Sequence, residues 1–99
     1  MIEQKNIDEA LRRLIDVYNP LTVYLFDQSP DVAFVIVVEG SWQKPQKRGI
    51  AGKYALWGLE IPKDILVFTK DEFEKHVDDA TNLVHAIKNE GKVLYAEAS

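Results

Sequence analysis

The sequence has 99 residues, of which 46% are hydrophobic and 28% are charged, fractions that are typical of a single globular domain, here residues 1–99. No apolar run is long enough to cross a bilayer, and no apolar export signal follows Met1, so we expect a cytoplasmic protein that does not enter a membrane. The net charge of −4 argues against broad nucleic-acid binding, which needs a basic surface, and the lack of cysteine excludes disulfides, thiolate metal sites and a cysteine nucleophile.

The first expected element is a helix that begins at Asn6, which can act as its N-cap with Glu9 as a capping-box partner. Apolar residues then recur at helical spacing and form one stripe, which consists of Ile7, Leu11, Leu14, Ile15 and Tyr18. Pro20 ends the helix, because the residue before a proline disfavours helical geometry. The first expected strand follows over residues 22–26.

The seven consecutive apolar residues of 32–38 predict a strand that is covered on both faces and lies at the centre of a sheet. Only residues 27–30 separate it from the first strand, which favours an antiparallel hairpin. A third strand is expected over residues 64–68. We therefore expect an α/β (α+β) fold, with a small mixed sheet of three to four strands packed against helices.

A further helix is expected after Pro45, which suits the first turn of a helix. Ile50, Tyr54 and Trp57 keep helical spacing on one face of it. The same stretch holds a basic cluster, interpreted as a solvated helix face, that consists of Lys44, Lys47, Arg48 and Lys53.

The last third of the chain predicts two short helices and a terminal strand or docked tail. Thr69 and Glu72 form a capping box that opens the first of these helices. The second is expected to start at Asp78 or Asp79 and to end at Gly91 in the left-handed conformation. Its expected buried face consists of Ala80, Leu83, Val84 and Ile87.

Two aspartates at strand starts are the candidate site. Asp31 precedes the central strand and Asp64 opens the third strand. If the two strands are neighbours, both carboxylates lie at one end of the sheet. Two close carboxylates repel unless a cation bridges them, so the pair predicts a Mg²⁺ site. The alternative is that each is a strand-end aspartate that faces water.

Several stretches carry a family resemblance: Leu11-Arg-Arg-Leu-Ile15 with Val23-Tyr-Leu-Phe26, residues 31–39, residues 54–62 with Asp64-Ile-Leu-Val-Phe-Thr69, residues 71–76 and residues 87–95. Together they resemble the minimal nucleotidyltransferase family, a small branch of the DNA polymerase beta superfamily. The resemblance covers nearly the whole chain and implies a nucleotidyltransferase-like fold.

In that family three aspartates hold two metal ions over a nucleoside triphosphate, and the resemblance implies that Asp31 is the first and Asp64 the third of these catalytic metal ligands. Ala33 stands where the family has its second aspartate. The family also has a Gly-Ser pair after its first strand, which opens a short helix that holds the triphosphate. Here Asp27 and Gln28 stand in its place, and too few residues remain for that helix.

The resemblance therefore implies a degenerate, catalytically impaired protein, a pseudoenzyme that acts as a binding or antitoxin-type subunit beside a helical HEPN-type partner. The rival hypothesis is an active Mg²⁺-dependent enzyme that transfers a nucleoside monophosphate from a triphosphate to a protein acceptor, with Glu39 or Asp27 as a substitute ligand. A third hypothesis is a homo-oligomer whose interface uses Trp42, Trp57 or a free sheet edge. The tryptophans are otherwise expected in the core.

Overall fold

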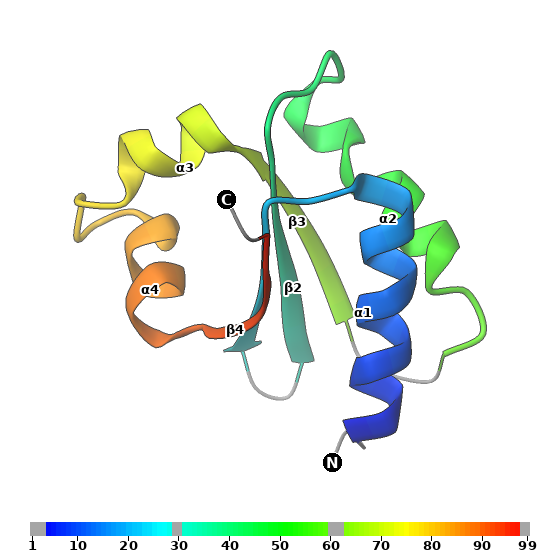
Figure 1. The fold of residues 1–99 in the computed structure, drawn as a ribbon. Coiled ribbons are helices and arrows are strands. Elements are labelled where there is room, and N and C mark those ends of the chain that lie inside the picture. The colour runs from blue at the N-terminus through cyan, green and yellow to red at the C-terminus, as the bar shows by residue number, and fades with distance from the viewer. Residues whose placement is uncertain (1–3, 29–30, 60–62, 98–99) are drawn as a thin grey trace.

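A four-stranded mixed sheet separates two layers of helices in the computed structural model, which describes residues 4–28, 31–59 and 63–97 (Figure 1). The strands lie in the order β3-β2-β1-β4. β2 pairs with β1 in antiparallel and with β3 in parallel orientation, and β4 pairs antiparallel with β1. Their bounds are Thr22–Gln28 for β1, Asp31–Val38 for β2, Lys63–Thr69 for β3 and Lys92–Ala96 for β4. The expected small mixed sheet is confirmed.

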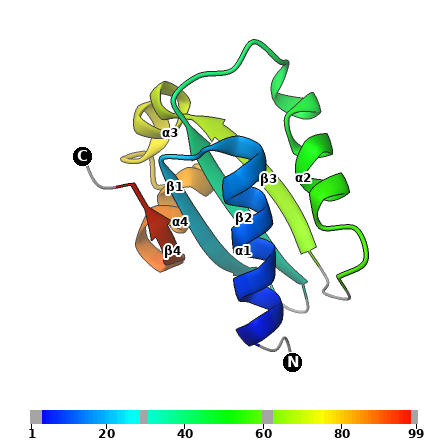
Figure 2. The same cartoon turned by 45° about the vertical axis from the view of Figure 1, so that its right-hand side comes forward.

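The helices cover both faces of this sheet. They are α1 (Gln4–Tyr18), the 3₁₀ helix η1 (Pro45–Lys47), α2 (Gly49–Ala55), α3 (Lys70–His76) and α4 (Leu83–Glu90). Figure 2 shows α1 and α2 on one side of the sheet and α3 and α4 on the other. Among the described residues, no helix is long and apolar enough to cross a membrane.

β2 is the central strand, as its apolar run predicts, with β1 and β3 as its neighbours. Its even-numbered residues from Phe34 onward pack with α1 in one core cluster. Its odd-numbered residues from Ala33 onward pack with α3 and α4 in the other. Because side chains alternate across a strand, one continuous apolar run supplies both cores.

The two predicted capping boxes have different outcomes. Asn6 lies inside α1, which already includes Gln4, so the expected N-cap there is wrong. The box that opens α3 is confirmed: the Thr69 hydroxyl accepts the N–H of Glu72 at 3.3 Å, and the Glu72 carboxylate accepts the N–H of Thr69 at 2.9 Å. The carboxylate thereby satisfies an N–H that α3 leaves unpaired at its start.

α4 starts later than the sequence suggests. Its N-cap is Asn82, whose side chain accepts the N–H of Val84 at 2.9 Å, and neither Asp78 nor Asp79 plays that part. The Asp79 carboxylate instead accepts the N–H and the hydroxyl of Thr81. These hydrogen bonds lower the pKa of Asp79 and hold a turn before the helix.

The end of α4 also differs from the expectation. Gly91 has φ −72° and ψ 150°, an extended conformation, because the chain runs straight into β4. Val84 and Ile87 are buried as expected, whereas Ala80 and Leu83 are exposed. The late start of α4 leaves Ala80 outside the helix and Leu83 at its first turn.

The apolar stripe expected for α2 and the turn after it faces solvent. The residues Ile50, Tyr54 and Trp57 are 47%, 75% and 80% exposed. The buried contacts of this segment come from Gly52 and Leu56 instead. A helix was therefore predicted correctly here, but α2 is shorter than expected, Trp57 lies in the turn after it, and the buried side was wrong.

A tyrosine on α1 explains why the glycine side of α2 faces inward. The Tyr18 hydroxyl donates to the carbonyl of Arg48 at 2.5 Å and accepts the N–H of Gly52 at 2.8 Å. A Cβ on Gly52 would lie 2.9 Å from both the Tyr18 hydroxyl and Cγ2 of Ile65. Only a residue without a side chain permits this approach.

Arg48 links the α2 segment to the start of α3. Its side chain is 7% exposed, and its Nη1 lies 2.6 Å from Oε1 of Glu72. Arg48 is therefore not part of a solvated basic face, contrary to the interpretation from sequence. Its hydrogen bonds, followed by the one from the N–H of Thr69, lower the pKa of Glu72. The same carboxylate thus closes the capping box and neutralises a buried guanidinium.

We predict that Glu72→Gln lowers the free energy of unfolding by about 1–3 kcal/mol, because the buried Arg48 loses its counter-ion. Glutamine can still close the capping box, so the loss measures the ion pair alone. Because the folded-state pKa of Glu72 lies below the ordinary glutamate value of 4.5, the stabilisation is complete above pH 4.5 and is lost as the pH falls through the folded pKa.

Urea unfolding between neutral and acid pH measures this difference, with Glu74→Gln on the exposed side of the same helix as the control. The difference between wild type and Glu72→Gln is expected to shrink in acid, while Glu74→Gln stays close to wild type. Equal stability of all three proteins at neutral pH would contradict the assigned role of the ion pair.

Candidate functional site

The two candidate aspartates belong to neighbouring parallel strands that begin at the same end of the sheet. Asp31 is the first residue of β2, and Asp64, the second residue of β3, lies directly opposite Ala33. The Asp64 side chain is exposed. The side chain of Asp31 lies outside the described part of the structure, so the distance between the two carboxylates stays a prediction.

Ala33 is a core residue. It is fully buried and belongs to the cluster on the α3 and α4 face of the sheet. The register places it between Phe26 on β1 and Asp64 on β3. Its methyl group packs against apolar neighbours. A methyl group cannot bind a cation.

The connection between β1 and β2 is shorter than the sequence suggests. β1 does not end at Phe26 but continues to Gln28, and Asp27 pairs with Val32. Only residues 29–30 separate the two strands. One helical turn needs about 3.6 residues, so no phosphate-holding helix fits between them. The expected hairpin is confirmed.

Neither substitute ligand of the rival hypothesis lies beside the two aspartates: Glu39 is at the other end of the sheet, and Asp27 is on the other face. Glu39 follows the far end of β2, and at about 3.3 Å per residue it lies roughly 25 Å from Asp31. Asp27 pairs with Val32, so it belongs to the opposite sheet face from Ala33 and Asp64. Within the described ranges, no group of three or more His, Cys, Asp or Glu residues could hold a metal ion. A Mg²⁺ site here would rest on Asp31 and Asp64.

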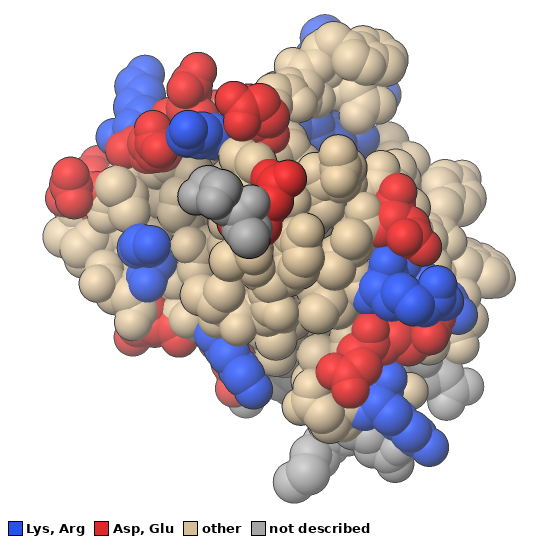
Figure 3. Space-filling model, in the orientation of Figure 1, with Lys and Arg blue, Asp and Glu red and all other residues tan. Residues whose placement is uncertain are grey.

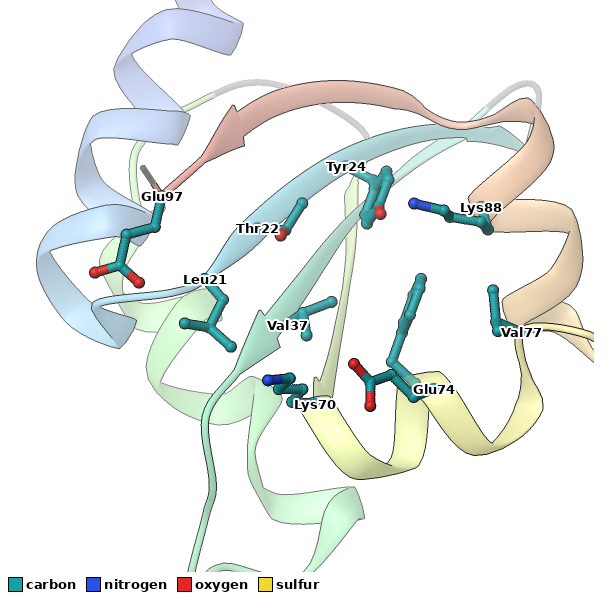
Figure 4. A pocket seen from close by; sticks show the side chains of 10 residues that line it. Leu21, Thr22, Tyr24, Val37, Lys70, Glu74, Val77, Lys88 and Glu97 are labelled. Carbon is teal, nitrogen blue, oxygen red and sulfur yellow. The ribbon is translucent and has the colours of Figure 1, made fainter. Parts of the chain in front are cut away.

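A pocket of about 380 Å³ lies at the other end of the sheet, between β1, α3 and α4 (Figure 4). Its floor is apolar and includes Tyr24 and Phe73, whose rings stack with centroids 5.6 Å apart. Its lining includes four charged residues, Lys70, Glu74, Lys88 and Glu97. Figure 4 shows the Lys88 amino group directed toward Tyr24. A pocket with an apolar floor and with both basic and acidic side chains around it suits an amphipathic ligand.

The sequence offered no signal for this pocket. Its lining comes from β1, β2, α3 and α4 together with three residues just outside these elements, Leu21, Val77 and Glu97, so no local spacing marks it. Thr22 opens β1 and Val37 lies near the end of β2, which places the pocket opposite the end with the aspartates. The pocket and the aspartates are therefore two separate sites.

Comparison with known proteins does not assign the chain to a family. No protein-family model, curated protein or solved structure matches it. Any functional assignment therefore rests on the geometry above and on the resemblance in the sequence.

We predict that Ala33→Asp lowers the free energy of unfolding by roughly 3 kcal/mol or more without metal, because it buries a carboxylate opposite Asp64. Mg²⁺ should restore part of the melting temperature if Asp31 and Asp64 share a cation with the new side chain. Calorimetry with and without Mg²⁺ measures both effects.

Ala33→Asn is the matched control, because it has the same shape without the charge and should not respond to Mg²⁺. Ala33→Asp should still transfer no nucleotide, because the triphosphate has no cradle, and misplacement of reacting groups by about 1 Å costs roughly 100-fold in rate. Nucleotidyl transfer by this single variant would show that the short connection is not the disabling feature.

Proposed function

We propose that this protein is a catalytically impaired, nucleotidyltransferase-like pseudoenzyme that works as the binding subunit of a two-component module. The observation that carries the proposal is the two-residue gap between β1 and β2. A nucleotidyltransferase must hold the triphosphate while metal ions stabilise the attacking and leaving oxygens. This chain lacks the length for the family's cradle at the point where the resemblance requires one.

The burial of Ala33 supports the same proposal. A catalytic carboxylate must reach the metal ions, whereas this position contributes to a closed core. A fully buried alanine opposite Asp64 leaves the inherited site with fewer ligands and less negative charge. Both changes remove parts that binding of metal and triphosphate needs, and neither disturbs the sheet.

The type of partner comes from the resemblance. Members of the minimal nucleotidyltransferase family often pair with a helical HEPN-type protein as the antitoxin half of a module. A scaffold that keeps its sheet and its helices and loses its cradle suits such a binding role. The rival, an active Mg²⁺-dependent nucleotidyltransferase that modifies a protein acceptor, retains one supporting observation, namely that Asp31 and Asp64 start neighbouring parallel strands.

The test has two parts. The native complex is captured on the tagged full chain, and the purified complex is then incubated with each labelled nucleoside triphosphate and Mg²⁺. We expect a stable complex with a helical protein and no label on any protein. Asp64→Asn should leave the complex intact, because asparagine keeps the size of this exposed side chain at the start of β3 and removes only its charge.

Label transfer that disappears in Asp64→Asn would establish the rival function. Label transfer that persists in this variant would point to a contaminating enzyme, and repeated purification of the variant complex would remove it. A chain that forms no complex with another protein would contradict the proposed binding role even if no label is transferred.

A further inference from the structure

One stretch of the chain differs from the rest in its charge. All 16 acidic residues lie outside residues 40–59, although the whole chain has a net charge of −4. This stretch contains three exposed lysines, Lys44, Lys47 and Lys53. In Figure 3, acidic side chains gather over α3, whereas the right-hand outline, where α2 lies in Figure 1, is largely neutral.

The same stretch exposes large apolar side chains. Trp42 is 93% exposed, and Trp57 and Tyr54 are 80% and 75% exposed. Tyr54 and Trp57 line a shallow hollow of about 310 Å³ with Ile50 and Lys53. Tryptophan and tyrosine are among the residues that contribute most binding energy at protein interfaces.

A groove of about 370 Å³ continues from this hollow to the edge of the sheet, and the two share Ile50 and Lys53. One wall is formed by η1 and α2, and the other by the consecutive residues 65–68 of β3. Successive side chains of a strand point to opposite faces, so a groove that touches four in a row lies along the strand's edge. β3 pairs with β2 on its other side and is the last strand of the sheet, so within residues 4–28, 31–59 and 63–97 no strand pairs with this edge.

We propose that this groove binds an extended, acidic segment of another protein, which adds to the free edge of β3 as a further strand. The proposal rests on the binding role proposed above and names the surface that performs it. Backbone groups of the added strand would pair with those of β3, and its apolar side chains would cover Ile50 and Trp57. Its acidic side chains would face Lys53 of α2, Lys47 of η1 and Lys44 just before η1, which gives charge complementarity.

The charges disfavour the other occupants. A second copy of the chain paired through β3 about a two-fold axis would bring Lys53 of one copy toward Lys53 of the other, and like charges across an interface are unfavourable. A nucleic acid could stack on the aromatic rings, but it would leave the strand edge unpaired. An acidic strand would cover the exposed aromatic rings, pair with the charges of the lysines and form backbone hydrogen bonds with the edge of β3.

The test selects peptides from a random displayed library on the purified full chain and then titrates the best synthetic peptide by fluorescence anisotropy. We expect the selected peptides to be acidic, with alternating apolar residues. Trp57→Ala should lower the affinity for the peptide by about tenfold or more, and Lys53→Glu should lower it by roughly tenfold. Amide exchange should slow in residues 65–68 when the peptide binds.

Two control variants distinguish an effect specific to the groove from a general effect of a changed charge or a lost apolar side chain. Lys75→Glu changes an exposed lysine on α3, and Leu83→Ala removes an exposed apolar side chain on α4. Both should bind the peptide as wild type does, and circular dichroism should show that all four variants are folded.

Selection of basic or neutral peptides, or slowed exchange elsewhere than β3, would overturn the proposal. A dimer in sedimentation that Trp57→Ala dissociates would overturn it in favour of a second copy. Quenching of Trp57 by a thymidine oligonucleotide at physiological salt, with no acidic peptide selected, would overturn it in favour of nucleic acid. These outcomes test only whether the groove beside β3 is the binding surface. The proposed function is tested separately, by label transfer and complex formation.

Discussion

The need to cover β2 on both faces determines most of this architecture. Its apolar run has no polar side toward water, so helices must lie above and below it and strands must lie on either side. The tight hairpin supplies β1 as one neighbour. A crossover through η1 and α2 supplies β3 as the parallel neighbour, because a parallel strand cannot be reached by a short turn.

Local patterns predicted the parts of the fold that depend on local physics. The apolar run of β2, the short connection before it and the Thr69 capping box each involve residues within a few positions of one another, and all three are present. The orientation of α2 was missed because it depends on the hydroxyl of Tyr18, a residue 34 positions from Gly52. Helical spacing reveals an apolar stripe, but it does not show which side of the helix packs against a tyrosine that is distant in the sequence.

The candidate site was predictable only in part, for the same reason. Neighbouring parallel strands bring the starts of β2 and β3 together, so the sequence could place Asp31 and Asp64 at one end. It could not show that β1 continues to Gln28, because Asp27 and Gln28 are poor strand formers that join the sheet through pairing with β2. The ion pair of Arg48 with Glu72 was likewise hidden, since the two residues are 24 positions apart.

The exposed stripe on α2 is informative because it does nothing for the fold. The Gly52 side of this helix packs against α1 and β3, and the outer side chains Tyr54 and Trp57 are 75% and 80% exposed. Exposed aromatic area near an unpaired strand edge favours unwanted association, which proteins usually avoid. Ala33 differs from this stripe, since its small apolar side chain is fully buried in the core on the α3 and α4 face of the sheet. The described structure thus combines a closed apolar core on both faces of β2 with exposed aromatic area beside the edge of β3, and this combination fits the binding role proposed above.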